Sequence, residues 1–163
     1  MPILLNYNDK EIKGDVTAKG FEDYMSLYSM QFGIGRAVTM EVGEMNNRDS
    51  GRPSISEVTV SKQMDGASAM IFKDSLSGRS MPKLLVELVR TGAESGFSKF
   101  VSYELCDVIL SSYSISAGDS GAPIENLCFS FSKIIMTHAS SDKSNKEGTN
   151  VIVGYDLASG EPQ

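Results

Sequence analysis

The chain has 163 residues, a formal net charge of −6 and a sequence pI of about 4.8. This length is most simply one domain with a sizeable core. The acidic balance argues against a nucleic-acid backbone as the main partner, because phosphate binding needs clustered Lys and Arg. No apolar run approaches the ~20 residues that span a bilayer, and the first residues lack the pattern of a secretory leader. We therefore expect no membrane insertion and no signal peptide.

The first two predicted strands lie at residues 3–7 and 24–34, with a polar, glycine-punctuated loop at residues 9–20 between them. The longer strand alternates aromatic or apolar side chains with mixed ones, which is typical of a half-exposed sheet. Ser29 and Gln31 fall on its polar face.

Residues 40–53 follow neither the helical nor the strand period and are rich in Asn, Asp, Gly and Pro, so we predict an extended loop. A long loop inside a compact domain tends to be functional, which makes this segment a candidate contact surface. A further strand is predicted at residues 54–62.

One helix is predicted over about residues 66–77, with Asp65 or Ser68 as its N-cap and Gly78 after its end. Its apolar residues Ala69, Phe72 and Leu76 recur at helical spacing, and we expect this stripe to pack against a sheet or a barrel end.

The second half of the chain reads as long strands at residues 82–90, 97–110 and 111–117, followed by a turn at residues 118–122. Residues 123–138 are predicted to form one long strand. One of its faces carries Leu127, Phe129, Phe131 and Ile135, and the other begins hydroxylated and becomes apolar at Ile134 and Met136. Such a strand is expected to leave one sheet and join another. Strands with turns between them and one helix indicate a β-barrel or a β-sandwich.

After residue 138 the composition changes, so we divide the chain into a β-barrel domain at residues 1–138 and a C-terminal tail at residues 139–163. Residues 140–150 are charged and serine-rich and are predicted to form a mobile linker. Residues 151–157 are predicted to form a short strand that pairs with an edge of this subunit or of a neighbour.

The sequence shows no combination of residues that predicts an enzyme active site. Gly118, Asp119, Ser120 and Gly121 resemble the nucleophile motif of chymotrypsin-like proteases, but the single histidine, His138, follows the serine, where those enzymes place it before. Cys106 and Cys128 lack the CxxC spacing of a zinc or redox site, and a single histidine gives a metal ion few ligands. We therefore predict no catalytic residue, no cofactor and no metal.

The order of several motifs resembles the hemolysin-coregulated proteins (Hcp) of type VI secretion. Residues 12–15 are similar to the IKGE-type opening of that family, and residues 56–78 to its strand followed by a single helix. The strongest similarity is to the signature D-V-I-V-S-S…G…P-x-E-x-L-x-L-x-F-x-K. Its positions are occupied here by Asp107, Val108, Ser111, Pro123, Glu125, Leu127, Phe131 and Lys133.

The resemblance implies a closed or nearly closed barrel of two sheets with one flanking helix. It also implies hexameric rings that stack into a tube beneath a spike and inside a sheath, carry small effectors, and leave the cytoplasm by secretion. Under this interpretation Glu41, Glu44, Arg48 and Arg52 are candidates for ring stacking or a subunit interface, and Ser29 and Gln31 are candidates for cargo contact in the lumen. Two alternatives are a stand-alone adhesin-like or carbohydrate-binding β-sandwich and a small hydrolase that depends on Ser120 and His138.

Overall fold

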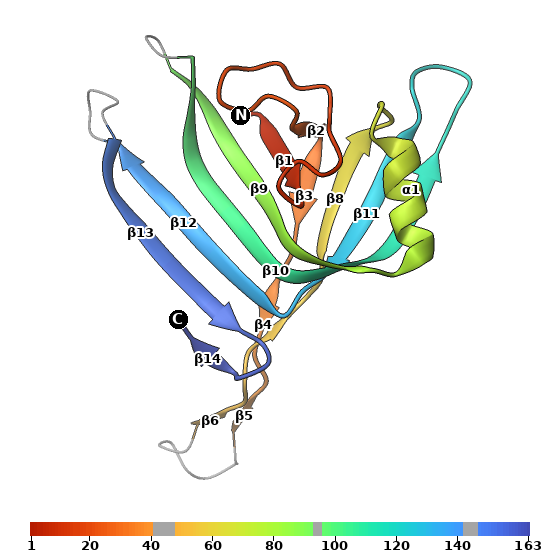
Figure 1. Ribbon diagram of the computed structural model, residues 1–163. Helices are drawn as coiled ribbons and strands as arrows, with labels where there is room; N and C mark the ends of the chain where they lie inside the picture. The colour runs from red at the N-terminus through yellow and green to blue at the C-terminus, as the bar shows by residue number, and fades with distance from the viewer. Residues whose placement is uncertain (41–47, 93–95, 142–146) are drawn as a thin grey trace.

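A computed structural model describes residues 1–40, 48–92, 96–141 and 147–163 of the chain. Within these ranges the protein is mainly β with one flanking helix, as predicted, and ten strands hydrogen-bond into one curved sheet (Figure 1). Those strands are β1 (Ile3–Tyr7), β2 (Met25–Leu27), β3 (Ser29–Gln31), β8 (Val58–Gln63), β9 (Ser80–Gly92), β10 (Gly96–Ser116), β11 (Ile124–Ser130), β12 (Lys133–Ser141), β13 (Glu147–Asp156) and β14 (Glu161–Pro162).

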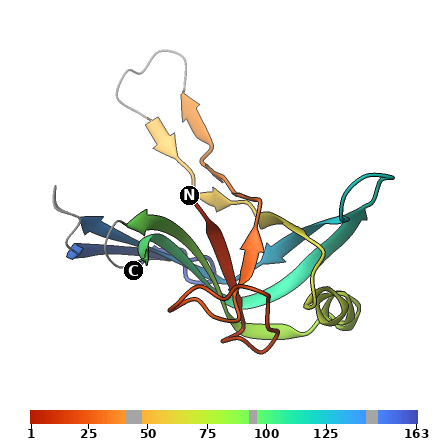
Figure 2. The ribbon, with the colours of Figure 1, turned by 90° about the horizontal axis from the view of Figure 1, so that it is seen from above.

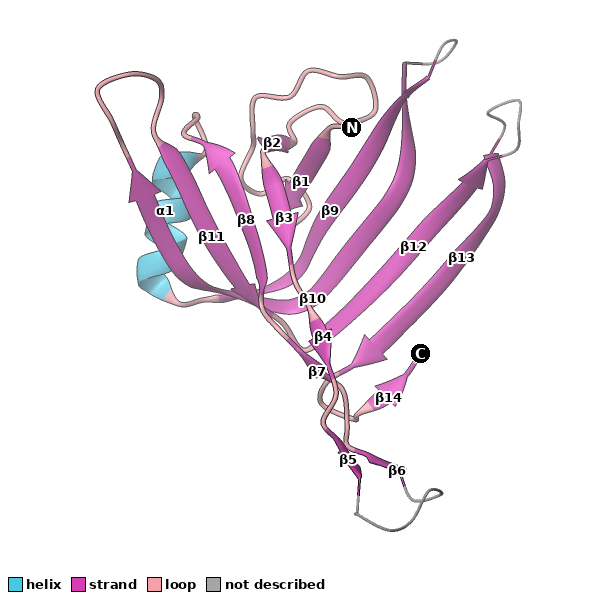
Figure 3. Ribbon diagram, turned by 180° about the vertical axis from the view of Figure 1, so that it is seen from behind, coloured by secondary structure: helices cyan, strands magenta, loops and turns pink. Residues whose placement is uncertain are grey.

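Strand β10 is the centre of the sheet. One of its edges pairs with β9, which is followed by β1 and β2. The other edge pairs with β12 over Val101–Cys106 and with β11 over Ile109–Ser116. The sheet therefore divides into one arm of β12, β13 and β14 and a second arm of β11, β8 and β3, which Figure 3 shows diverging from β10.

The two arms separate at a bend in β10. Asp107, between the two paired segments, has a φ of 51°, in the left-handed region. The hydroxyl of Ser132 donates to the Asp107 carboxylate at 2.7 Å, and the Ser132 N–H donates to the carbonyl of Cys106 at 3.0 Å. These bonds hold the junction of β11 and β12 against the bend.

The long strand expected at residues 123–138 is two strands, and the prediction of one continuous strand is wrong. Its neighbours change at the break as expected, because β11 pairs with β8 and β12 pairs with β13. The inward face also shifts by one residue there: Leu127 and Phe129 are buried before the break, and Ile134 is buried after it in place of Ile135. Phe131 and Ser132 lie outside both strands, which resets the alternation.

The sheet wraps around the core without closing by strand pairing among the described residues, so the closed barrel is not confirmed. Tyr28 alone separates β2 from β3, and its N–H donates to the carbonyl of Ser61 at 2.8 Å. The core between the walls is formed by Leu5, Tyr7, Met25, Val58, Val60, Ile71, Leu84, Val86, Leu105, Leu127 and Phe129, among others.

Helix α1 (Ser68–Ser77) lies close to its predicted bounds of about 66–77. Its N-cap is Ala67, without a side-chain capping bond, so the predicted N-cap at Asp65 or Ser68 is wrong; the Asp65 carboxylate instead accepts a hydrogen bond from the Ala67 N–H at 3.0 Å. Gly78, with a φ of 61°, ends the helix in the left-handed conformation that favours glycine.

The helix buries a different face from the one expected. Phe72 and Leu76 are 50% and 74% exposed, whereas Ile71 is fully buried, so the predicted packing of the stripe is wrong. Asp74 also lies on the buried face. Its carboxylate is paired with Arg79 at 2.7 Å and accepts a hydrogen bond from Tyr7 at 3.1 Å, which makes a charged residue tolerable there.

The segment predicted as an extended loop protrudes from the sheet as a narrow ribbon (Figures 1 and 3). The described residues of the predicted loop, 40 and 48–53, include an antiparallel ladder of Val38–Met40 with Arg48–Ser50. A second ladder, of Ile34–Gly35 with Ser54–Ile55, lies just outside the predicted bounds. The strands are β4 (Ile34–Gly35), β5 (Val38–Met40), β6 (Arg48–Ser50) and β7 (Ser54–Ile55).

The C-terminal segment extends the sheet. The boundary expected at residue 138 falls inside β12, and β13 pairs with β12 from Lys133 to Ser141. Residues 151–157 thus pair with an edge of their own chain. Among the described residues, the last part of β13 has a second neighbour, since β14 pairs with Tyr155 and Asp156.

Candidate functional site

Four neighbouring strands present a polar, uncharged face to the outside of the sheet. The cross-strand register places Ser29, Ser61, Asn126 and Ser114 in one row. Gln31, Thr59, Cys128 and Ser112 form the next row. We call these eight residues the polar face; directly paired residues share a face of the sheet, and none of the eight carries a charge at neutral pH.

The residues between these rows explain why the polar side chains point outward. Met30, Val60, Leu127 and Val58 alternate with them along β3, β8 and β11 and pack into the core. Because the side-chain period of a strand is two, burying this apolar set presents the hydroxyl and amide set on the opposite surface.

Hydrogen bonds connect the strands across the polar face. The hydroxyls of Ser29 and Ser61 are 2.6 Å apart, and Thr59 Oγ1 is 3.4 Å from Cys128 Sγ. Ser111, the extra residue at a register shift in β10, donates to the Cys128 carbonyl at 3.1 Å. The face is thus a surface of hydroxyl and amide groups held in register.

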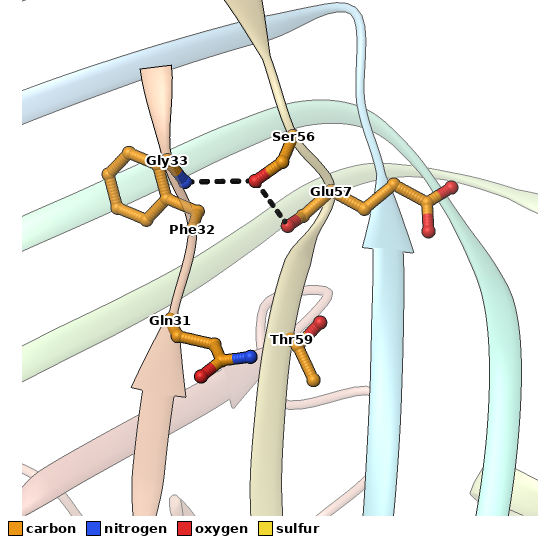
Figure 4. A pocket seen from close by; sticks show the side chains of 6 residues that line it. All are labelled: Gln31, Phe32, Gly33, Ser56, Glu57 and Thr59. Carbon is orange, nitrogen blue, oxygen red and sulfur yellow. Dashed lines mark hydrogen bonds between the residues drawn. The ribbon is translucent and has the colours of Figure 1, made fainter. Parts of the chain in front are cut away.

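A hollow of about 540 Å³ lies at the end of the polar face beside the base of the ribbon (Figure 4). Gln31 and Thr59 line it together with Phe32, Ser56 and Glu57. The Ser56 hydroxyl accepts from the Gly33 N–H at 2.9 Å and donates to the Glu57 carbonyl at 3.2 Å, which ties β3 to β8. The hollow offers hydrogen-bonding groups and one carboxylate to a bound molecule.

A second hollow of about 320 Å³ adjoins the first and is mainly apolar. It shares Gln31 and Phe32 with the first, and Tyr103 and Leu88 form its far side. The rings of Phe32 and Tyr103 meet edge to face with centroids 5.3 Å apart.

The structure brings together some of the residues that the sequence singled out. Ser29 and Gln31 both lie on the polar face and are exposed. Arg52 lies at the base of the ribbon, with its guanidinium against the turn at Gly160. Arg48 begins β6, opposite Met40. Glu41 and Glu44 lie outside the described residues.

The sequence analysis did not name Ser61, Thr59, Asn126, Cys128, Ser112 or Ser114 as site residues. The signal that points to them is the alternation of serines along residues 111–117 and of polar residues along 123–130. The sequence does not show the strand register that aligns these positions across β8, β11 and β10.

The arrangement does not assemble a hydrolase. Ser120 follows one end of β10, whereas His138 pairs with Val101 near the other end, so the two side chains cannot form a dyad within one chain. The imidazole of His138 instead packs on Phe100, with ring centroids 5.1 Å apart. Within the described ranges no three His, Cys, Asp or Glu side chains cluster as metal ligands would. The described helix is too short and too polar to cross a bilayer.

Comparisons with known proteins agree on one family. The model of the family described as "Type VI secretion system effector, Hcp" matches residues 5–138. A structure described as that of a type six secretion system protein is 22% identical, covers 99% of both chains and has a TM-score of 0.88. Hcp1 from Salmonella typhimurium is 20% identical, with 99% of this chain and 98% of that chain covered and a TM-score of 0.78.

A type VI secretion system effector from Yersinia pestis is more distant. It is 16% identical, covers 94% of this chain and 98% of its own, and has a TM-score of 0.68. A comparison with curated protein sequences gave no match. At these identities the structural similarities show the fold, and the family model, which spans most of the chain, shows the relationship. The chain belongs to the Hcp family of type VI secretion system proteins.

Proposed function

We propose that the protein is a structural, non-enzymatic subunit of the type VI secretion inner tube. Six copies form a ring, rings stack into a tube beneath the spike and inside the sheath, and the subunit is secreted with the tube from the cytoplasm. Membership of the Hcp family supports this proposal, together with a wall of strands that offers hydroxyl and amide groups.

We infer further that the barrel is completed at Tyr28, where β2 and β3 turn the chain from one side of the sheet to the other. The hydrogen bond from Tyr28 to Ser61 supports this closure. It is also supported by the chain itself, which runs directly from β2 to β3, and these are the last strands at two ends of the sheet. A nearly closed wall suits a ring subunit because it leaves few free edges for irregular association.

We assign the polar face to the lumen of the ring, where it contacts small secreted effectors through Ser29 and Gln31. Its hydroxyl and amide groups bind polar surfaces by hydrogen bonds, and the neighbouring Glu57 carboxylate, which accepts from Ser111 at 2.9 Å, adds one negative charge. The adjoining hollow of about 540 Å³ provides a recess for one side chain of such a cargo.

We assign stacking between rings, or contact between subunits, to the protruding ribbon. Glu41, Glu44, Arg48 and Arg52 supply both signs of charge in or beside this segment. Charges at the edge of an interface mainly set its register and its association rate. Reversing Arg48 and Arg52 to Glu is expected to weaken stacking and secretion and to leave the single ring intact.

The first test is the mass of the purified protein by light scattering, followed by electron microscopy of the particles. A closed six-fold ring is the expected result. A monomer at all concentrations, also after addition of the spike and sheath components, would contradict the proposal and favour a stand-alone binding module.

The lumen assignment is tested with Gln31→Glu, which places a negative charge on the polar face. Thr91→Glu, at an exposed position of β9 away from that face, is the matched control. We expect Gln31→Glu to keep the ring mass and to lose the small proteins that copurify with the wild-type ring. Equal retention of those proteins by both variants would refute the assignment.

A further inference from the structure

The apolar interior surface of the sheet continues onto an uncovered part of the arm formed by β12 and β13. Tyr103 pairs with Met136, which pairs with Val153, and in the next row Val101 pairs with His138, which pairs with Val151. Val101 is buried, but Met136, Val153 and Val151 are 38%, 59% and 57% exposed. We call Met136, Val151, Val153 and Tyr103 the open apolar face.

The same side of the sheet is covered on the other arm of the molecule. There it is covered by α1, which buries Ile71 and sets Phe72 against Tyr113 with ring centroids 5.6 Å apart. On the open apolar face the Phe32 ring packs against Tyr103, with centroids 5.3 Å apart, whereas Met136, Val151 and Val153 stay exposed. An exposed apolar surface that extends a core is typical of a contact with another chain.

A second apolar surface lies on the outer side of α1. Ala69, Phe72 and Leu76 are spaced by three and four residues, so they form one stripe, which we call the helix stripe. It lies opposite the buried Ile71, with Phe72 50% and Leu76 74% exposed. The amphipathic spacing that led us to expect burial is real, but within the described part of the chain the Phe72 ring meets Tyr113 at one side and the stripe otherwise stays exposed.

We propose that the helix stripe of one copy packs on the open apolar face of the next copy in the ring. The occupant of each surface is thus a second copy of this chain, and the proposal depends on the proposed ring. A helix with an apolar stripe and a sheet with an apolar face are complementary layers of the kind that form domain cores. Neither surface includes a carboxylate; Lys73 lies beside the helix stripe, and His138 lies between Val101 and Val151 on the open apolar face.

The positions of the two surfaces suit a head-to-tail contact. Helix α1 and the arm of β12 and β13 lie on opposite sides of the molecule in both Figure 1 and Figure 2. A contact between different surfaces of identical copies repeats from copy to copy and generates a ring when its rotation closes. A two-fold contact would instead join one surface to itself.

Cysteine crosslinking tests the contact directly. In a background with Cys106→Ala and Cys128→Ser, we place Leu76→Cys and Val153→Cys together in one chain and oxidise at the concentration where rings form. A ladder of covalent oligomers up to the ring is the expected result. Each single-cysteine variant alone should stay uncrosslinked, and a mixture of the two should give dimers only.

Charge substitutions provide an independent test with a matched control. Val153→Lys lies on the open apolar face, whereas Ile152→Lys lies on the opposite face of the same strand and is similarly exposed, at 64%. We expect Val153→Lys to reduce ring assembly at least tenfold by light scattering and Ile152→Lys to leave it unchanged. Thermal unfolding of both variants, at a concentration where neither assembles, checks that each remains folded.

The outcomes separate this inference from the proposed function. If the wild type forms rings but the double-cysteine chain does not crosslink, the contact is refuted and the ring is not. The same holds if Val153→Lys is folded and still forms rings. Equal disruption by Ile152→Lys and Val153→Lys would also overturn the contact, because edge pairing of β13 would then explain both. Monomers of wild type that also fail to crosslink would remove the ring and the contact together.

Discussion

At the scale of single residues, the strongest feature of the molecule is a buried ion pair under the helix. Lys62 and Glu125 are both fully buried, with Nζ 2.9 Å from Oε2. Lys62 also bonds Asp65 at 2.8 Å, while the hydroxyls of Ser68 and Tyr113 each donate to Glu125 at 2.7 Å. The glutamate of the Hcp-like signature thus joins β8, β10, β11 and the start of α1.

Removing both partners of this pair should cost less than the two single removals added together. We expect Glu125→Gln to lower the free energy of unfolding by on the order of 3 kcal/mol, because Lys62 loses a buried counter-charge. The double variant Glu125→Gln/Lys62→Met should lose less than the sum of the two single variants. Urea unfolding measures all three. Glu104→Gln, in the partly exposed pair with Lys83, is the control and should cost under about 1 kcal/mol.

The same cluster makes stability depend on acidic pH. Burial alone raises the pKa of Glu125, but hydrogen bonds from Lys62, Tyr113 and Ser68 outweigh it, so its pKa lies below the ordinary value. Burial and the bond to Glu125 raise the pKa of Tyr113 to about 12, so the phenol remains a donor through the neutral range.

A carboxyl whose pKa is lowered by folding stabilises the protein above its unfolded pKa, near 4.3 for Glu, and this contribution is lost as pH falls through the folded pKa. We therefore expect the urea midpoint to fall between pH 5 and pH 3, and to fall less steeply in Glu125→Gln. Parallel pH profiles for the two proteins would show that other carboxyls govern the acid transition.

At the scale of elements, helix α1 shows that residue spacing alone does not decide which face of a helix is buried. Two stripes fit the helical period, and the one that contains Asp74 is the one that folds inward. Its burial depends on Arg79 and Tyr7, which are distant in sequence or lie beyond the helix, so no local pattern identifies it. The end of the helix was predictable because Gly78 marks it locally, whereas its N-cap is Ala67, which makes no side-chain capping bond.

This assignment of faces predicts opposite results for two apolar truncations. Ile71→Ala should destabilise the unassembled chain by about 2–4 kcal/mol, because it opens a cavity in the core. Leu76→Ala should change stability by under about 0.5 kcal/mol, since the side chain is 74% exposed. Urea unfolding below the assembly concentration gives both values. A larger loss of stability from Leu76→Ala than from Ile71→Ala would mean that the helix buries the opposite face.

The bend of β10 gives a physical reason for the aspartate of the D-V-I motif. Asp107 adopts a φ of 51°, which Asp and Asn tolerate better than most residues, and it accepts the hydrogen bond from Ser132. We expect Asp107→Asn to be nearly neutral and Asp107→Ala to cost about 1–2 kcal/mol. Thermal unfolding of the pair measures the difference, and equal stability of the two variants would mean that the bend does not depend on this side chain.

At the scale of the whole molecule, strand content and order were predictable from the sequence, and the way the strands join was not. Alternation located β8 and β11 because each buries one face, whereas β1 is short and buries both. It missed the break at Phe131 and Ser132, since both halves alternate and only the pairing with β10 shows the shift. The polar face was found at Ser29 and Gln31 alone, because its other six members depend on register.

The length and place of β10 also constrain the order in which the subunit can fold during synthesis. Strand β8 has its main partner in β11, and both arms attach to β10, which begins only at Gly96. Until β10 and β11 have left the ribosome, β9 with β1 and β8 with β3 remain separate pairs, because contacts so distant in sequence form late. We therefore expect an arrested chain that ends before residue 96 to be protease-sensitive and one that includes β12 to be resistant. The nascent subunit is therefore expected to stay open to chaperones and proteases until β10 and its partner strands have emerged.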